Sequence, residues 1–152
     1  MIKKIDSVRF RRFGWVIEYP RKSQYKSKNP KSKNLFRIVA REKDRVGWRI
    51  AYLVVRDKAI TRLEQHIETL ESFEPVCGET LLYVSDERKA SRIECFYLDR
   101  PVILKKGIWH GVVTLGRDSE IKIAENFKVK CIYWRLGRDL NSKGSPQKTP
   151  SL

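Results

Sequence analysis

Two histidines and two glutamates are the residues of this 152-residue chain whose types suit chemistry at a shared site. His66 lies in RLEQHIETLESFEPVCG between Glu64 and Glu71, and His110 lies 44 positions later in KKGIWHGVVTL. Imidazole nitrogens and carboxylate oxygens together suit Zn, Ni, Mn or Fe. The four side chains are therefore candidate ligands of one divalent metal ion, whose identity the donor types leave open.

The segment around His66 is predicted to be a β-strand, and alternation along it decides which side chains can meet. Residues two apart share a face, so Glu64 and His66 point the same way, with Arg62 on that face too. Gly107 permits a tight turn into the strand that carries His110. We expect both histidines to face one cavity, although a single histidine is more often a core or surface residue than a ligand.

Short extended segments separated by turn signals must position these residues. The predicted strands are WVIEY (15–19), LFRIVA (35–40), GWRIAYLVV (47–55), AITRLEQHI (59–67), TLLYVS (80–85), IECFYL (93–98), PVILKKG (101–107), IWHGVVTL (108–115), EIKIAEN (120–126) and VKCIYWRL (129–136). Strands at this spacing predict an all-β fold, an antiparallel sandwich or barrel. A short N-terminal helix through VRFRRF is expected, capped by Asp6 or Ser7 and ended by Gly14.

The positive charge of the chain is concentrated near its start. Residues 1–60 carry 18 Lys and Arg against 5 Asp and Glu, whereas residues 61–137 carry 12 against 12. The densest part, residues 20–34, mixes Lys with Ser, Asn and Pro, which is typical of a solvated loop. A phosphate- or RNA-contacting arm is the alternative, but no aromatic strand motif or basic recognition helix accompanies it, so nucleic acid is not the expected partner.

The remaining composition bounds the domain organisation and the compartment. We predict one domain over residues 1–136 and a disordered tail over 137–152. No apolar run approaches a membrane span and MIKKIDSVRF lacks the apolar stretch of a signal peptide, so we expect a cytoplasmic protein without a membrane partner. Three cysteines without CxxC spacing argue against a disulfide framework or a structural zinc site.

The spacing of several of these residues resembles motifs of a known family. Four residues separate His66 from Glu71 and six separate Glu71 from Gly78, a spacing that resembles the second half of the first cupin motif. The second cupin motif resembles the stretch Gly107-Ile108-Trp109-His110. Glu64-Gln65-His66 followed by Phe73-Glu74-Pro75-Val76-Cys77-Gly78 resembles the ureidoglycolate lyase family of cupins, as does the opening RFRRFGWVIEY. The resemblance covers roughly residues 5–130 and implies a cupin-type β-barrel or double-stranded β-sandwich with a short N-terminal helix.

The resemblance also implies an activity and a set of site residues. The activity is carbon–nitrogen lyase chemistry, which cleaves ureidoglycolate to glyoxylate and urea with a divalent metal ion. Glu64, His66, Glu71 and His110 would be metal ligands, with Glu71 and His110 catalytic. Arg62, Lys106 and Trp109 would bind a small carboxylate substrate. A homodimer is expected, with the apolar N-terminal strands as the interface.

Other readings of the same residues stay open. Gly111 and Val112 stand where the family's lyases place His and Pro, which leaves room for a non-catalytic cupin that binds a small hydroxy- or sugar acid. Glu64 can equally be an exposed strand residue, and Glu71 can cap a loop. Arg62 and Lys106 can be ordinary surface charges, and Trp109 a core residue.

Overall fold

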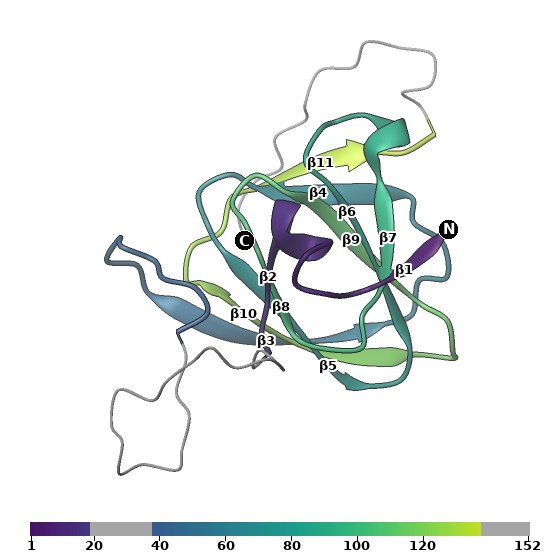
Figure 1. Ribbon diagram of the computed structural model, residues 1–152, viewed down its shortest axis with the longest axis horizontal. Helices are drawn as coiled ribbons and strands as arrows, with labels where there is room; N and C mark the ends of the chain where they lie inside the picture. The colour runs from purple at the N-terminus through teal and green to yellow at the C-terminus, as the bar shows by residue number, and fades with distance from the viewer. Residues whose placement is uncertain (19–37, 138–152) are drawn as a thin grey trace.

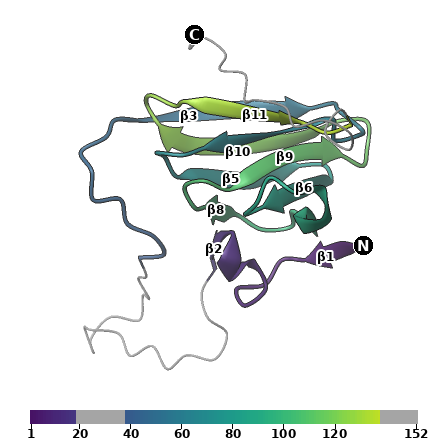
Figure 2. The same ribbon diagram turned by 90° about the horizontal axis from the view of Figure 1, so that it is seen from above.

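Two β-sheets packed face to face form the protein in the computed structural model, which describes residues 1–18 and 38–137 (Figure 1). The six-stranded sheet contains, in order, β1 (Ile2–Lys4), β7 (Glu94–Tyr97), β6 (Thr80–Ser85), β9 (Trp109–Thr114), β4 (Arg62–His66) and β11 (Cys131–Arg135). The five-stranded sheet contains, in order, β2 (Gly14–Val16), β8 (Val102–Leu104), β5 (Glu71–Cys77), β10 (Ser119–Asn126) and β3 (Trp48–Val55). Figure 2 shows β1 and β2 at one end of this stack of strands and β3 and β11 at the other.

The all-β prediction is confirmed, as a sandwich and not a closed barrel. Every strand pairing is antiparallel except that of β1 with β7, which is parallel. Two strands were not predicted: β1, and β5, whose glutamates and proline hide its alternation. Residues 38–40 of the predicted strand 35–40 are not in a strand, while residues 35–37, the basic loop 20–34 and the tail from residue 138 onward lie outside the described residues.

The end of the sandwich next to β1 and β2 is closed by aromatic packing. The short 3-10 helix η1 (Phe10–Arg12) brings Phe10 and Phe13 onto Phe96 of β7, with ring centroids 5.3 and 5.8 Å from it. All three rings are fully buried in the core, and each such ring stabilises the fold by roughly 1.5–3 kcal/mol relative to exposure. The expected helix through VRFRRF is thus only this three-residue turn, and its N-cap is Arg9, without a side-chain cap, instead of Asp6 or Ser7. Asp6 Oδ1 accepts the backbone N–H groups of Val8 and Arg9 at 2.9 Å in the segment just before the turn.

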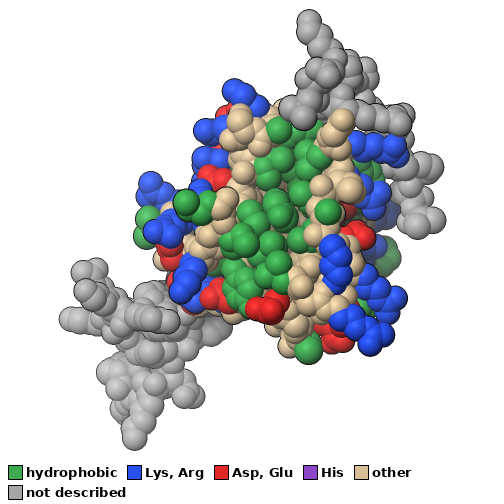
Figure 3. All heavy atoms as spheres, turned by 90° about the vertical axis from the view of Figure 1, so that its right-hand side faces the viewer, with side chains coloured by type: hydrophobic (Ala, Val, Ile, Leu, Met, Phe, Trp, Pro, Cys, Tyr) green, Lys and Arg blue, Asp and Glu red, His purple; other side chains and the backbone are tan. Residues whose placement is uncertain are grey.

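Alternation along the strands separates the interior of the sandwich from its outer faces. In β10 the side chains of Ser119, Ile121 and Ile123 are buried, while those of Glu120 and Lys122 lie at the surface between them. A second 3-10 turn, η2 (Ala90–Arg92), precedes β7. On the side where Figure 1 places β1 and β7, hydrophobic side chains form a contiguous patch bordered by charged ones (Figure 3). No helix among the described residues is long and apolar enough to cross a membrane.

Gly14 was expected to end the N-terminal helix, but it begins β2 instead. It pairs with Leu104 of β8 so closely that a Cβ atom would overlap the carbonyl oxygen of Ile103. Contact with backbone, not helix termination, therefore explains glycine at this position.

Gly14→Ala should destabilise the protein, because β2 and β8 must move apart to admit a methyl group. We expect the free energy of unfolding to fall by about 1–3 kcal/mol, measured by urea denaturation. Gly116→Ala is the matched control, since the nearest atom to its added Cβ is 3.8 Å away, and it should change the free energy by less than about 0.5 kcal/mol. Equal stability of the two variants would contradict the close β2–β8 contact.

Candidate metal centre

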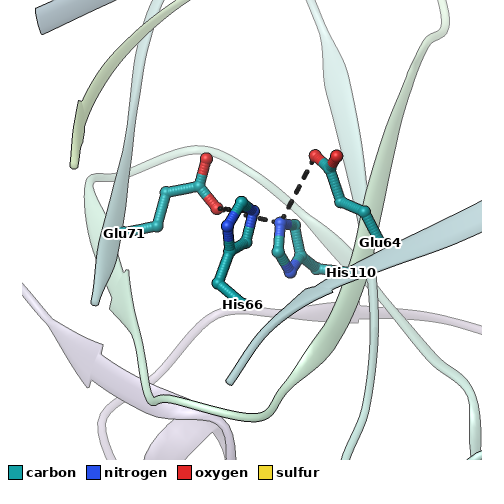
Figure 4. A group of neighbouring side chains, drawn as sticks. All are labelled: Glu64, His66, Glu71 and His110. Atoms are coloured by element: carbon teal, nitrogen blue, oxygen red, sulfur yellow. Dashed lines mark ion pairs between the residues drawn. The ribbon is translucent and has the colours of Figure 1, made fainter. Parts of the chain in front are cut away.

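Four side chains from three strands converge inside the sandwich (Figure 4). Glu64 and His66 come from β4, Glu71 from β5 and His110 from β9. One potential ligand atom of each residue lies within 4.8 Å of those of all the others. The structure thus brings together all four residues that the sequence proposed as metal ligands.

The topology explains why residues so far apart in sequence meet. β4 pairs with β9 so that Glu64 lies directly opposite His110, and alternation puts His66 on the same face. β5 belongs to the opposing sheet, and Glu71 extends from it across the interior toward both histidines (Figure 4). The donors therefore come from both layers, and packing of the sheets fixes their separation.

The carboxylate of Glu71 is the common neighbour of the two imidazoles. Its Oε2 lies 2.9 Å from His110 Nε2 and 3.3 Å from His66 Nε2. The Oε1 atom of Glu64 lies 3.5 Å from the same His110 nitrogen. The two imidazole rings are stacked, with centroids 5.1 Å apart and planes inclined by 21°. The Nε2 atoms of both histidines and the carboxylate oxygens of both glutamates thus lie around one small volume between the two sheets.

The donor atoms of this cluster lack hydrogen bonds although they are buried. The side chains of His66, Glu71 and His110 are only 5%, 6% and 2% exposed. His66 Nε2, Glu71 Oε2 and His110 Nε2 have no hydrogen-bond partner among the described residues. Their only close polar contacts among the described residues are the ion-pair contacts within the cluster, so a positive charge, either a proton on an imidazole or a cation held between them, is what these buried atoms need. Two imidazoles and two carboxylates form a ligand set that suits Zn, Ni, Mn or Fe.

Contacts around the cluster hold His110 in the orientation that ligation needs. Its Nδ1 lies 3.0 Å from the carbonyl oxygen of Ile108, so Nδ1–H donates there and Nε2 faces the carboxylates. The turn before it depends on Gly107, whose φ of 80° favours glycine. The Gly107 N–H donates to the His66 carbonyl at 2.7 Å, and Gln65 Nε2 donates to the Gly107 carbonyl at 2.7 Å. The expected tight turn is thus present, and it ties the two histidine segments together.

Burial and charge shift the pKa values within the cluster in opposite directions. Burial acts to lower the pKa of His110, but the negative charges of Glu71 and Glu64 outweigh it and raise that pKa to about 10. Burial lowers the pKa of His66, and Glu71 opposes only part of this effect. Burial acts to raise the pKa of Glu64, yet contact with His110 and the nearby positive charges lower it overall. The cluster thus favours a positive charge beside ionised carboxylates, which a divalent cation also supplies.

A cavity of about 540 Å³ adjoins the cluster. Glu64 and His110 line it, together with Asp57, Thr61, Arg62 and Arg135. The side chain of Glu64 is 36% exposed, far more than those of the other three cluster residues. Glu64 and His110 therefore form the side of the cluster that a small molecule in the cavity can reach.

Two arginines stand directly opposite each other beside this cavity. Arg62 of β4 pairs in register with Arg135 of β11, and neither makes an ion pair with a described residue. The guanidinium of Arg62 lies over the Tyr133 ring, 4.9 Å from its centroid. Like charges directly opposite each other destabilise a sheet unless an anion compensates them. Arg62 was expected from the sequence, but Arg135 was not, because only the β4–β11 register places it at the cavity.

Lys106 and Trp109, the other expected substrate-binding residues, do not line the cavity. Lys106 Nζ contacts Glu42 Oε2 at 2.7 Å and Asp44 Oδ2 at 3.6 Å. Trp109 precedes His110 in β9, so alternation sends it to the opposite face of the sheet, where it packs against Trp134 with centroids 5.8 Å apart. Neither placement brings the side chain to the cluster.

Cys131 is a neighbour of the cluster that the sequence did not indicate. It pairs with His66 in the β4–β11 register, and its Sγ lies 3.9 Å from His66 Nδ1. The thiol is thus on the side of the ring away from Glu71 and can accept the Nδ1–H of a ligating imidazole.

Comparison of the sequence with protein-family models and with curated proteins finds no match to either. The likeness to the cupin and ureidoglycolate lyase motifs therefore rests on the residues quoted above.

Glu71→Gln should abolish tight metal binding, because it removes the carboxylate charge that contacts both imidazoles. In the wild type, we expect Ni²⁺ or Zn²⁺ to raise the thermal unfolding midpoint and a chelator to reverse the rise. Glu74→Gln is the matched control, since Glu74 lies on the same strand but contacts Lys122 at 2.7 Å. A metal-induced rise that persists in Glu71→Gln would show that the ion binds elsewhere.

Proposed function

We propose that this protein is a metal-dependent carbon–nitrogen lyase that cleaves ureidoglycolate to glyoxylate and urea. The proposal rests on the position of the two-histidine, two-glutamate cluster beside a cavity. The same cavity is lined by two arginines, Arg62 and Arg135, that form no ion pair with the part of the chain that the structure describes. The sequence motifs that resemble the ureidoglycolate lyase family support the same choice of substrate. The four cluster residues would hold the ion, which acts as a Lewis acid toward a substrate oxygen when bound.

Charge balance assigns the carboxylate of the substrate to the arginines. Glu64 and Glu71 together neutralise a divalent ion, so the ion end of the cavity attracts a neutral hydroxyl more than a second anion. Arg62 and Arg135 exceed Asp57 by one positive charge, which suits a single carboxylate. Guanidinium groups bind carboxylates through paired, charge-assisted hydrogen bonds, which also fix orientation. The substrate then lies with its carboxylate at the arginines and its hydroxyl toward Glu64 and His110.

Glu64 is the residue best placed to move the proton that the reaction requires. Its lowered pKa keeps it ionised, and it is the cluster carboxylate that faces the cavity. Glu64 takes the hydroxyl proton, and the oxygen electron pair forms the new carbonyl bond of glyoxylate. The carbon–nitrogen bond breaks, its electron pair passes to nitrogen, and the proton on Glu64 completes urea. No additional reactant is needed.

Glu71 and His110 were assigned catalytic roles from the sequence. Their burial favours a role as ligands of the ion, with Glu64 as the residue that exchanges a proton with the substrate. The Glu71 side chain is 6% exposed and does not line the cavity, so it suits ion binding and not proton exchange with substrate. The Nε2 atom of His110 faces both carboxylates, which suits a ligand. Of the two cluster residues that line the cavity, Glu64 has the more exposed side chain, at 36% against 2% for His110.

The decisive assay measures urea and glyoxylate release from ureidoglycolate by the metal-loaded wild type. We expect release that is lost in His110→Ala. Arg135→Met should raise KM by roughly 10- to 100-fold, because it removes a charge-assisted hydrogen bond to the carboxylate. Arg117→Met, which changes an arginine outside the cavity lining, should leave KM unchanged.

Absence of turnover in the metal-loaded wild type would contradict the lyase proposal. The non-catalytic alternative predicts a different result, in which hydroxy- or sugar acids bind to the metal-loaded protein without being converted. Calorimetric titration with glycolate in the same preparation separates that alternative from a protein that binds no acid at all.

A further inference from the structure

An apolar stripe runs along the exposed face of β3. Trp48, Ile50, Tyr52 and Val54 alternate along the strand and are 72%, 54%, 58% and 41% exposed. Residues two apart share a face, so the four side chains form one continuous row. The Tyr52 hydroxyl donates to Glu120, which leaves the ring itself at the surface. Exposed large side chains are common singly, but an aligned row of four marks an interaction surface.

Among residues 1–18 and 38–137, β3 is also an edge strand with an unpaired side. It ends the five-stranded sheet and is paired on one side only, with β10. The residues of β10 opposite the stripe are polar or small: Glu120, Lys122, Ala124 and Asn126. The apolar row thus lies at the free edge, where proteins ordinarily place charged residues or proline to prevent pairing. Free backbone groups and an apolar face together favour addition of another strand.

The segments of this chain outside the described residues do not match this surface in composition. Residues 19–37 and 138–152 are rich in Lys, Ser, Asn and Pro, and neither contains four alternating apolar residues. A strand that covers the stripe must itself alternate apolar residues on one face. β3 has that pattern, so a second copy of the same strand meets the requirement.

We propose that β3 pairs with β3 of a second copy, antiparallel and about a two-fold axis at Ala51. In this register Trp48 lies opposite Val54 and Ile50 opposite Tyr52, so every residue of the stripe meets an apolar partner. The pairing satisfies the free edges and joins the two five-stranded sheets into one continuous sheet. By residue count, the same register brings Arg45 of one copy level with Asp57 of the other, which matches opposite charges.

The oligomeric state of the full chain tests the proposal directly. Light scattering after size exclusion should give the wild type twice the 18.0 kDa mass of one chain. Ile50→Lys should give a single-chain mass, because a lysine at the edge cannot be buried against Tyr52 of the partner. Val8→Lys is the matched control, since Val8 is 68% exposed and follows β1 at the other end of the stack, and it should stay dimeric. Circular dichroism checks that both variants remain folded.

Disulfide trapping tests the register. Directly opposed residues of antiparallel strands have Cα atoms about 4.5–5.5 Å apart, within the range of a disulfide. In a Cys77→Ser background, which removes the exposed native thiol, Ala51→Cys should form a covalent dimer under mild oxidation. Leu53→Cys should not, because Leu53 lies opposite Arg49 and not opposite its own copy.

Three results would overturn the proposal. They are a wild type of single-chain mass, an Ile50→Lys variant that remains dimeric, and equal cross-linking of Ala51→Cys and Leu53→Cys. The proposal does not depend on the lyase activity or on metal binding.

Discussion

The contact between Glu71 and His110 joins the two sheets, and the rest of the candidate site depends on it. A carboxylate oxygen from the five-stranded sheet lies 2.9 Å from an imidazole nitrogen of the six-stranded sheet, with both side chains buried. Removing such groups from water is costly unless their charges are compensated. A proton on His110 provides that compensation without an ion, and a divalent ion provides more of it. A positive charge at this position, from either source, therefore stabilises the packing of the two sheets. The need for that charge is also the reason why the cluster suits a cation.

The two ends of the sandwich differ in composition: one is packed with aromatic rings, and the other carries charged side chains beside the cavity. Near β1 and β2, the rings of Phe10, Phe13 and Phe96 close the core by packing against one another. At the other end, Arg135 of β11 lines the cavity and lies opposite Arg62 of β4. Arg49 contacts Glu125 of β10 at 2.9 Å, which places further charge at this end. The packed end supplies stability, and the polar end can therefore hold unsatisfied and like-charged groups.

Alternation allowed much of this fold and most of the cluster to be predicted from the sequence. The all-β class and most strands followed from short branched and aromatic runs, and the shared face of Glu64 and His66 followed from their spacing. Alternation could not reveal β5, where proline and two glutamates interrupt the pattern. Nor could it place Arg135 or Cys131, because both approach the site through the β4–β11 register, which joins residues far apart in sequence. The sequence likewise could not show that Lys106 contacts Glu42 and Asp44 instead of lining the cavity.

X-ray absorption spectroscopy of the metal-loaded protein tests the central claim, that Glu64, His66, Glu71 and His110 hold one ion. The account predicts a shell of nitrogen and oxygen atoms only, with multiple scattering from two imidazoles. His110→Ala should remove one imidazole contribution or the metal itself. A sulfur neighbour at about 2.3 Å would place Cys131 in the ligand shell and contradict the account. A spectrum without imidazole scattering would contradict it more completely, because the ion would then lie outside the cluster.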